Sequence, residues 1–518
     1  MEIIKSRTPV YVVIVCGVGL VALLGFLLIR GDGRQEQEQW AISNESAPTA
    51  MVIGQPTATV WGLLQRRAPG APVLTPTPDN PHPLPALRKE PEQYTVKAGD
   101  TLGQIAGRYG ISLGQITLAN QLINPNLLSI GQVLVIPAPA PSGSGSAFKV
   151  IPDSELVYGP ADIGFDVQAE VQRFGGYLAS YREEVGGMSL TGAQVVESIA
   201  QDFSVNPRLL LAVLEHQGGW LTNPMPEKGA QEYPIGFPDP ARKGLYRQLA
   251  WAANNLSRGF YLWRVNAVPA WPLADGDMVP AVPTINAGTA GVQQFFALLD
   301  NRSGWEKDVS EQGLFATYSK LFGYPFDFAI DPSIPQNLTQ PAMQLPFEAG
   351  AEWAFTGGPH AAWGDGSAWS SLDFAPPVEE LGCVDSNAWV VAVADGLVLR
   401  SGSGLVVFDL DADGLEQTGW VVIFMHIATR DRIQAGVYLQ AGERIGHPSC
   451  EGGVSTGTHF HIARRFNGEW IAADQSVPFN LDGWISSGAG KEYDGFLTRG
   501  SQRIEAYAGL IPENTIRR

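Results

Sequence analysis

The C-terminal third of the sequence holds residues that could bind a metal ion and use it in catalysis. His459 and His461 are separated by one residue, so in a strand both imidazoles would point to one face while Phe460 turns toward the core. His360 and Asp373 lie upstream, at the two ends of a glycine-rich loop. Catalytic zinc takes three protein ligands of the His, Asp, Glu and Cys types and leaves a further position for water. The set predicts a zinc hydrolase; the alternative is a pair of histidines on a solvated strand face.

Two segments resemble motifs of a known family. The segment Gly358–Phe374, which contains Ser-Ser-Leu-Asp-Phe at its end, is similar to the first zinc motif of the lysostaphin-type endopeptidases. Its long loop between histidine and aspartate resembles their β-lytic and staphylolytic branch. The segment Trp420–His426 resembles the middle motif of this family, with Phe424 and Met425 where a tyrosine is usual. Neither residue offers the hydroxyl of tyrosine as a hydrogen-bond donor, whereas the expected metal ligands and active-site histidines are present.

The resemblance implies a role for each residue of the set. His360, Asp373 and His461 correspond to the ligands of one zinc ion per chain, and His459 and His426 to active-site histidines without a metal bond. A neutral imidazole can accept the proton of an attacking water, and His459 is the better candidate for this base. His426 would then hydrogen-bond the tetrahedral intermediate or pass a proton to the leaving amine. The family does not settle which histidine performs which step.

The sequence around these residues predicts an antiparallel, β-rich domain. Runs of apolar residues bounded by turn residues predict strands at residues 390–393, 396–399, 404–408, 421–426 and 460–463. Between two of them, Asp409, Asp411 and Asp413 begin like a calcium loop, but Trp420 stands at the twelfth position instead of glutamate. We expect a solvated hairpin turn there.

Two cysteines flank the strand and loop that carry the set. Cys383 follows the metal loop and Cys450 precedes the His459 strand, so a disulfide between them would brace the rim of the site outside the cytoplasm. The alternative is two free buried thiols. The third cysteine, Cys16, lies within an apolar run.

The apolar run near the N-terminus is long enough to cross a bilayer as a helix. Residues 10–29 contain no charged side chain, and basic residues flank them on both sides, so charge alone does not orient the segment. The run lacks an Ala-x-Ala-like end, which favours an uncleaved anchor over a signal peptide. We therefore expect residues 1–9 in the cytoplasm and a single-pass membrane protein with its ectodomain outside. The alternative is a protein secreted after signal cleavage.

A linker and a small module follow the anchor. Residues 30–92 are rich in Gln, Glu, Pro, Ala and Thr and predict an extended tether, in which His82 would be solvated. Residues 93–138 combine two strand-like ends with two short helical patterns. This segment resembles a LysM module, which implies binding to N-acetylglucosamine-containing glycans. The alternative is a small spacer domain.

A second linker, 139–147, leads to a helix-rich region at 148–345. Thr191 and the pair Asn206-Pro207 are typical of helix starts. The second helix faintly resembles lytic transglycosylases, but Gln217 stands where their catalytic glutamate would be, and glutamine cannot donate a proton. Glu215 would point to another face of the helix. We expect a non-catalytic, lysozyme-like domain that binds or positions glycan, with a helical spacer as the main alternative and an active second hydrolase as the least favoured.

The whole chain of 518 residues predicts a multidomain α+β protein. Its parts are a membrane anchor helix, a small βααβ LysM module, a helix-rich lysozyme-like domain and an antiparallel β-rich peptidase domain at 346–518. The net charge of -18 argues against nucleic-acid binding. The resemblance implies a membrane-anchored zinc endopeptidase that cleaves peptide cross-links of peptidoglycan. The alternatives are a degenerate relative that binds the wall and regulates other hydrolases, and a structural wall tether.

Overall fold

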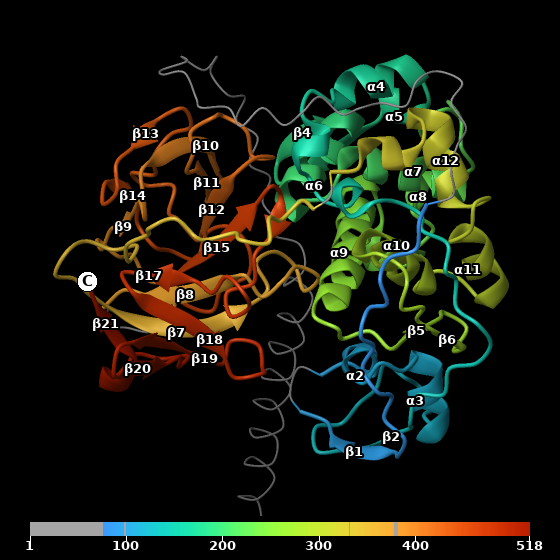
Figure 1. Ribbon diagram of the computed structural model, residues 1–518, viewed down its shortest axis with the longest axis horizontal. Helices are drawn as coiled ribbons and strands as arrows, with labels where there is room; N and C mark the ends of the chain where they lie inside the picture. Colours follow the sequence, from blue (N-terminus) through green and yellow to red (C-terminus); the bar gives the residue numbers. More distant parts are fainter. Residues whose placement is uncertain (1–75, 98–99, 331, 378–381) are drawn as a thin grey trace, which may run out of the picture.

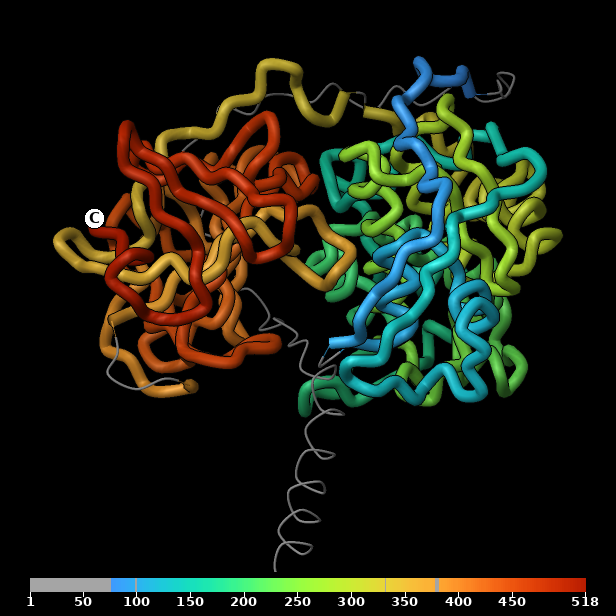
Figure 2. The backbone as a smooth tube through the Cα atoms, turned by 90° about the horizontal axis from the view of Figure 1, so that it is seen from below, coloured from blue at the N-terminus to red at the C-terminus, as the bar shows by residue number. Residues whose placement is uncertain are grey.

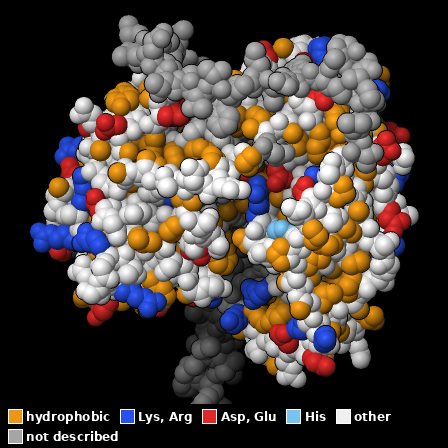
Figure 3. Space-filling model, in the orientation of Figure 1, with side chains coloured by type: hydrophobic (Ala, Val, Ile, Leu, Met, Phe, Trp, Pro, Cys, Tyr) orange, Lys and Arg blue, Asp and Glu red, His pale blue; other side chains and the backbone are white. Residues whose placement is uncertain are grey.

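The computed structural model describes residues 76–97, 100–330, 332–377 and 382–518. The predicted anchor at 10–29 and the residues before it lie outside the described residues. Within the described ranges, no helix combines the length and apolar character that a membrane span requires. The described chain forms a helical lobe and a β-rich lobe, and residues 332–346 cross from one to the other (Figures 1 and 2). In the space-filling view the surface is hollowed where the lobes meet, with Lys and Arg side chains along the furrow (Figure 3).

The small N-terminal module has the strand, helix, helix, strand order that the sequence predicts. Its elements are β1 (Glu92–Thr95), α2 (Leu102–Arg108), α3 (Leu113–Ala119) and β2 (Val133–Ile136). The two strands pair antiparallel. Thr101 and Ser112 each begin a helix with a reciprocal capping box, which satisfies amide groups that a short helix leaves free. The module packs on the helical lobe, because Ala270 and Met278 of that lobe belong to its apolar core.

The last part of the predicted tether packs on the helical lobe, and our expectation of a solvated His82 is wrong. The His82 ring stacks on Trp263 with centroids 4.6 Å apart, and its Nε2 lies 2.7 Å from the Trp263 carbonyl oxygen. The amides of Asp79 and His82 donate to the carbonyl groups of Thr284 and Pro283. A proline-rich segment has no internal hydrogen bonds, so its free backbone groups can pair with another surface.

The start signals in the sequence define two helices of the helical lobe correctly. The helices are α4 (Val167–Phe174), α5 (Tyr177–Ser180), α6 (Gly192–Phe203), α7 (Pro207–Gly218), α8 (Lys228–Glu232), α9 (Leu245–Arg264), α10 (Ala287–Ala297), α11 (Arg302–Asp308) and α12 (Leu314–Phe322), with hairpins β3–β4 (Arg182–Val185, Met188–Thr191) and β5–β6 (Ala270–Pro272, Met278–Pro280). Thr191 caps α6 and Asn206 caps α7. Glu215 accepts hydrogen bonds from the amides of Leu221 and Thr222, so its carboxylate stabilises the turn after α7.

The β-rich lobe contains one large sheet in the described part of the chain. Its strand order is β13-β10-β11-β12-β15-β8-β7-β21, with β16 paired to β15. The bounds are β7 (Glu352–His360), β8 (Ser371–Ala375), β10 (Gly396–Gly402), β11 (Leu405–Asp409), β12 (Trp420–Met425), β13 (Tyr438–Leu439), β15 (Phe460–Phe466), β16 (Glu469–Trp470) and β21 (Thr515–Arg517). A second sheet holds β17 (Asn480–Leu481), β18 (Trp484–Gly488), β19 (Gly495–Arg499) and β20 (Gln502–Glu505), and β9 (Val390–Val391) pairs with β14 (Arg444–Gly446).

The two faces of the large sheet belong to different cores. Val422 and Ile462 point into the apolar core of the β-rich lobe itself. Ile423 and Ala463 point the other way and join the core of the helical lobe. His461 shares its face with Ala463, because side chains two residues apart in a strand point to the same side. The helical lobe therefore covers part of the face that carries the candidate site.

Candidate metal centre

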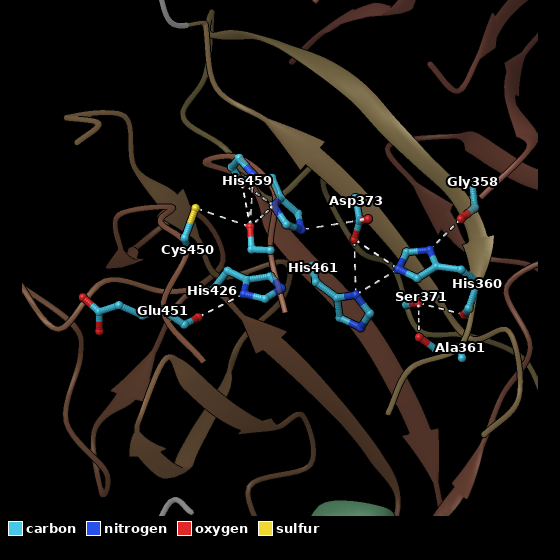
Figure 4. Close-up of polar contacts among 12 residues, drawn as sticks. Gly358, His360, Ala361, Ser371, Asp373, His426, Cys450, Glu451, His459 and His461 are labelled. Carbon is cyan, nitrogen blue, oxygen red and sulfur yellow. Dashed lines mark hydrogen bonds and ion pairs between the residues drawn. The ribbon is translucent and has the colours of Figure 1, made fainter. Parts of the chain in front are cut away.

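Three neighbouring strands bring the predicted zinc ligands together. His360 ends β7, Asp373 lies in β8, and His461 stands opposite Asp373 in the pairing of β15 with β8. The Asp373 Oδ1 atom is 3.2 Å from His360 Nε2 and 3.2 Å from His461 Nδ1. The two imidazole nitrogens are 3.0 Å apart (Figure 4). All three residues are buried, and their donor atoms lie within 4.8 Å of one another.

The chemistry of these three donors fits a metal ion. His360 Nδ1 lies 2.7 Å from the Gly358 carbonyl oxygen, which only accepts, so this nitrogen carries the proton and Nε2 presents its lone pair. Asp373 Oδ1 is buried and accepts no well-aligned hydrogen bond. Lone pairs that converge in a buried place repel one another unless a cation lies between them. A set of two imidazoles and one carboxylate is a ligand set that zinc takes.

The ionisation of Asp373 and His461 agrees with this fit, whereas at His360 burial lowers the pKa but the facing Asp373 outweighs it and raises the pKa above its ordinary value. Burial opposes the charge on Asp373, but the facing imidazoles of His360 and His461 outweigh burial and hold the carboxyl pKa well below its usual range. Burial lowers the pKa of His461 and keeps its imidazole neutral. Metal binding requires an ionised carboxylate and neutral imidazoles.

His426 and His459 lie next to this group with their rings 4.5 Å apart. His426 follows β12 with a left-handed φ of 62°, and its Nδ1 is 3.0 Å from the Glu451 carbonyl oxygen. His459 Nδ1 is 2.8 Å from the Gly457 carbonyl oxygen. In both rings the carbonyl fixes the proton on Nδ1, so Nε2 has a free lone pair. Burial and the neighbouring imidazoles lower the pKa of His426 to about 3.

The structure adds two residues that the sequence analysis did not find. The Tyr493 ring stacks on His360, with centroids 4.2 Å apart and planes at 20°. The Glu492 carboxylate accepts a hydrogen bond from the amide of Ala361, the residue after the ligand. Both come from the turn between β18 and β19, in the other sheet. A φ of 67° at Tyr493 gives the turn its shape, but no residue pattern in the sequence signals the contact.

The predicted disulfide is confirmed. Cys383 and Cys450 are bonded, with their Cα atoms 5.8 Å apart. Ser455 connects the bridge to the site, since its hydroxyl lies 3.4 Å from Cys450 Sγ and 3.3 Å from His459 Nδ1. The disulfide therefore braces the segment that holds His459.

The segment between β11 and β12 forms the expected hairpin turn, which contains Asp411 and Asp413, whereas Asp409 is buried at the end of β11. Their carboxylates lie within 4.8 Å of one another. Asp409 accepts hydrogen bonds from the amides of Asp411, Ala412 and Gly414. Burial raises the pKa of Asp409 to about 8. The turn's own amides engage the carboxylate of Asp409.

The matches of the chain to known proteins support a LysM-containing peptidase of the lysostaphin type, in its staphylolytic branch. A LysM domain model matches residues 94–137, and the model of the LasA N-terminal domain matches residues 149–336. The lysozyme-like, non-catalytic character expected for residues 148–345 stays a prediction.

Individual relatives are similar to parts of the chain. Protease LasA of Pseudomonas aeruginosa is 25% identical over 343 residues, which cover 62% of this chain and 74% of that protein. The beta-lytic metalloendopeptidase of Achromobacter lyticus is 28% identical over 160 residues, which cover 29% of this chain and 40% of that protein. The solved structure of the M23 metalloprotease pseudoalterin from the deep sea has 24% identity and a TM-score of 0.28, and the match covers 32% of this chain and 96% of that one.

Proposed function

We propose that the protein is a zinc-dependent endopeptidase that cleaves peptide bonds in the cross-links of peptidoglycan. The observation that carries the proposal is the convergence of His360, Asp373 and His461 on one point beside two further imidazoles. Protease LasA and the beta-lytic metalloendopeptidase are peptidases by name, which supports the reaction class.

In this proposal the residues of the chain divide the work. A zinc ion held by His360, Asp373 and His461 supplies Lewis-acid chemistry, which lowers the pKa of water and polarises a peptide carbonyl. His459 accepts the proton of the attacking water on its free Nε2. His426, neutral and held by its Nδ1, hydrogen-bonds the oxyanion or serves the leaving amine. Both imidazoles are fixed by carbonyl groups, so little reorganisation is needed during the reaction.

The remaining parts of the chain would bring this site to its substrate. The LysM domain would bind N-acetylglucosamine-containing glycan and hold the enzyme on the wall. The apolar segment 10–29 would anchor the protein in the cell membrane with its ectodomain outside the cytoplasm; release after signal cleavage is the alternative. The disulfide supports an oxidising compartment.

The test uses the full-length protein in detergent, incubated with purified murein. We expect one zinc ion per chain and new free amino groups on the released fragments, without new reducing sugar ends. Mass analysis of the fragments identifies the bond that is cut. A chelator should stop the release and added zinc should restore it. A protein that binds murein but neither holds zinc nor releases fragments would instead be a wall-binding regulator.

A further inference from the structure

The imidazole of His426 is held by a residue that lies 25 positions further along the chain. His426 follows β12 with a left-handed φ of 62°, so the pairing of β12 does not set the direction of its ring. The ring nitrogen Nδ1 lies 3.0 Å from the carbonyl oxygen of Glu451. His459, in contrast, contacts the carbonyl group of Gly457, two residues away in the same segment. The direction of the His426 ring therefore depends on the position of Glu451.

The side chain of Glu451 is bound to the segment that follows His426. Its two carboxylate oxygens each lie 2.9 Å from the amide nitrogen of Thr429, and the Thr429 hydroxyl donates to one of them at 2.6 Å. The Arg432 guanidinium lies 3.7 Å from the same oxygen. Hydrogen bonds to an ionised carboxylate are roughly twice as strong as those between neutral groups. Glu451 thus holds the His426 ring with its main chain and the residues after His426 with its side chain.

The main chain on both sides of Glu451 fits closely against its surroundings. On one side, the Ser449 hydroxyl donates to the His426 carbonyl oxygen and accepts from the Glu451 amide, both at 3.0 Å. On the other side, a Cβ atom at Gly452 would lie 2.3 Å from the carbonyl oxygen of Ser403, in the turn between β10 and β11. This close approach requires glycine, which by itself leaves the main chain conformationally free. The side chain of Glu451 is therefore needed to fix the segment.

The hydrogen bond to Glu451 determines which ring nitrogen of His426 is available. A neutral imidazole carries one proton, and the hydrogen bond of one nitrogen sets the state of the other. A carbonyl oxygen only accepts, so Glu451 keeps the proton on Nδ1 and leaves a lone pair on Nε2. Figure 4 shows the His426 ring between Glu451 and His461, with the centroids of the two imidazoles 6.5 Å apart. Without this hydrogen bond, the ring could turn or take the other tautomer.

We propose that Glu451 is a positioning residue for His426. Its carboxylate binds Thr429 and thereby fixes the carbonyl group that sets the direction and the tautomer of the His426 ring. The inference rests on the function proposed above, in which His426 takes part in the cleavage. Because Glu451 acts on a histidine outside the set of proposed zinc ligands, its loss should reduce turnover and leave zinc bound.

The test compares Glu451→Ala and Glu451→Gln in the full-length protein, with soluble cross-linked murein fragments as substrate. In Glu451→Ala we expect kcat to fall roughly 10- to 10²-fold, since a misplacement of about 1 Å can cost this much. KM and zinc content should change little. Glu451→Gln keeps an oxygen for the Thr429 amide and a donor for the Thr429 hydroxyl, so it should retain most of the wild-type kcat. The Glu451 side chain is 42% exposed, so both variants should remain folded.

Glu443→Ala is the matched control. Glu443 lies on the surface of the same lobe, and its carboxylate accepts a hydrogen bond from the amide of Gln440 at 2.7 Å. Its removal should leave kcat unchanged. The double variant Glu451→Ala/His426→Ala tests whether Glu451 acts through His426. If it does, the double variant should have the same kcat as His426→Ala alone, because residues that act through one another are not additive.

Nitrogen NMR of protein labelled at histidine shows the tautomer of His426 without any need for activity. We expect the proton on Nδ1 in the wild type, in Glu451→Gln and in the control. Glu451→Ala should show both tautomers, because its carbonyl group is no longer fixed. A single Nδ1 tautomer in Glu451→Ala, together with an unchanged kcat, would overturn the inference.

Two further outcomes would also overturn the positioning role. One is loss of zinc from Glu451→Ala, because the residue would then support the metal site. The other is an equal loss of kcat when His426 is already removed, because Glu451 would then act elsewhere. A wild-type protein that binds no zinc and cuts no murein would refute the proposed function instead. The NMR comparison would still show whether Glu451 fixes the ring of His426.

Discussion

The five residues of the candidate site fall into two groups that the protein holds in different ways. The proposed metal ligands His360, Asp373 and His461, here called the metal group, come from three adjacent strands, with Asp373 and His461 directly paired across β8 and β15. The proposed proton-transfer group, His426 and His459, lies just beyond the ends of β12 and β15 and next to the segment closed by the disulfide.

The way in which each group is held agrees with the role proposed for it. Strand pairing fixes the relative positions of the metal group through backbone hydrogen bonds, which suits ligands that must share one ion. The proton-transfer group is connected through Ser449, whose amide donates to the His426 carbonyl oxygen at 2.7 Å and whose own carbonyl accepts from His459 at 3.4 Å. Substitutions in the metal group should therefore reduce zinc binding, whereas substitutions in the proton-transfer group should reduce kcat and leave zinc bound.

The largest effect is expected from the metal group. His461→Ala removes one of three ligands, so we expect zinc content to fall to background and activity to fall by at least about 10³-fold. Metal analysis and murein cleavage measure the two losses. His82→Ala, on the surface of the helical lobe, serves as the control. Full activity with full zinc content in His461→Ala would remove this residue from the metal group.

A smaller and more selective loss is expected from the proton-transfer group. His459→Ala should keep one zinc ion per chain and lose roughly 10²–10⁴-fold in kcat, the range for a general base. His426→Ala should also keep zinc and lose kcat. If either variant lost its zinc together with its activity, the division of the site into two groups would be wrong.

Removal of the disulfide should affect the proton-transfer group more than the metal group. The double variant Cys383→Ser/Cys450→Ser frees the segment that carries Ser455, and with it the ring of His459. We expect the free energy of unfolding to fall by roughly 2–4 kcal/mol, as for other native bridges. At a temperature where the variant remains folded, kcat should fall more than zinc affinity. An equal or greater loss of zinc affinity would place the effect on the metal group.

The smallest effect is expected from Tyr493, which supports the metal group by stacking on His360. Tyr493→Ala should weaken zinc binding about tenfold, whereas Tyr493→Phe keeps the ring and should leave zinc affinity unchanged. Chelator competition measures both variants. Equal weakening by both changes would show that the hydroxyl, and not the stacked ring, is needed.

The sequence predicts those features of the fold that depend on local spacing. The period of two in His459-Phe460-His461 agrees with the strand β15, and Thr191 and Asn206 mark helix starts because capping is a local interaction. The βααβ order of the LysM module follows from its own pattern.

Several contacts between distant segments could not be predicted in this way. Glu451 meets Thr429 and Tyr493 meets His360 only after the strands and sheets have assembled. His82 was expected in solvent because proline-rich composition describes the segment and not the surface beside it. In each case the partner residue is of an ordinary type, and only the tertiary fold gives it a role.

We infer that a zinc ion and a separate imidazole base are both needed for the cleavage of peptide cross-links. Zinc content and the release of murein peptides can be measured side by side in the wild-type protein and in His459→Ala. We expect one zinc ion per chain in both proteins and peptide release by the wild type alone. Release of peptides by a zinc-free wild type, or undiminished release by His459→Ala, would refute this inference.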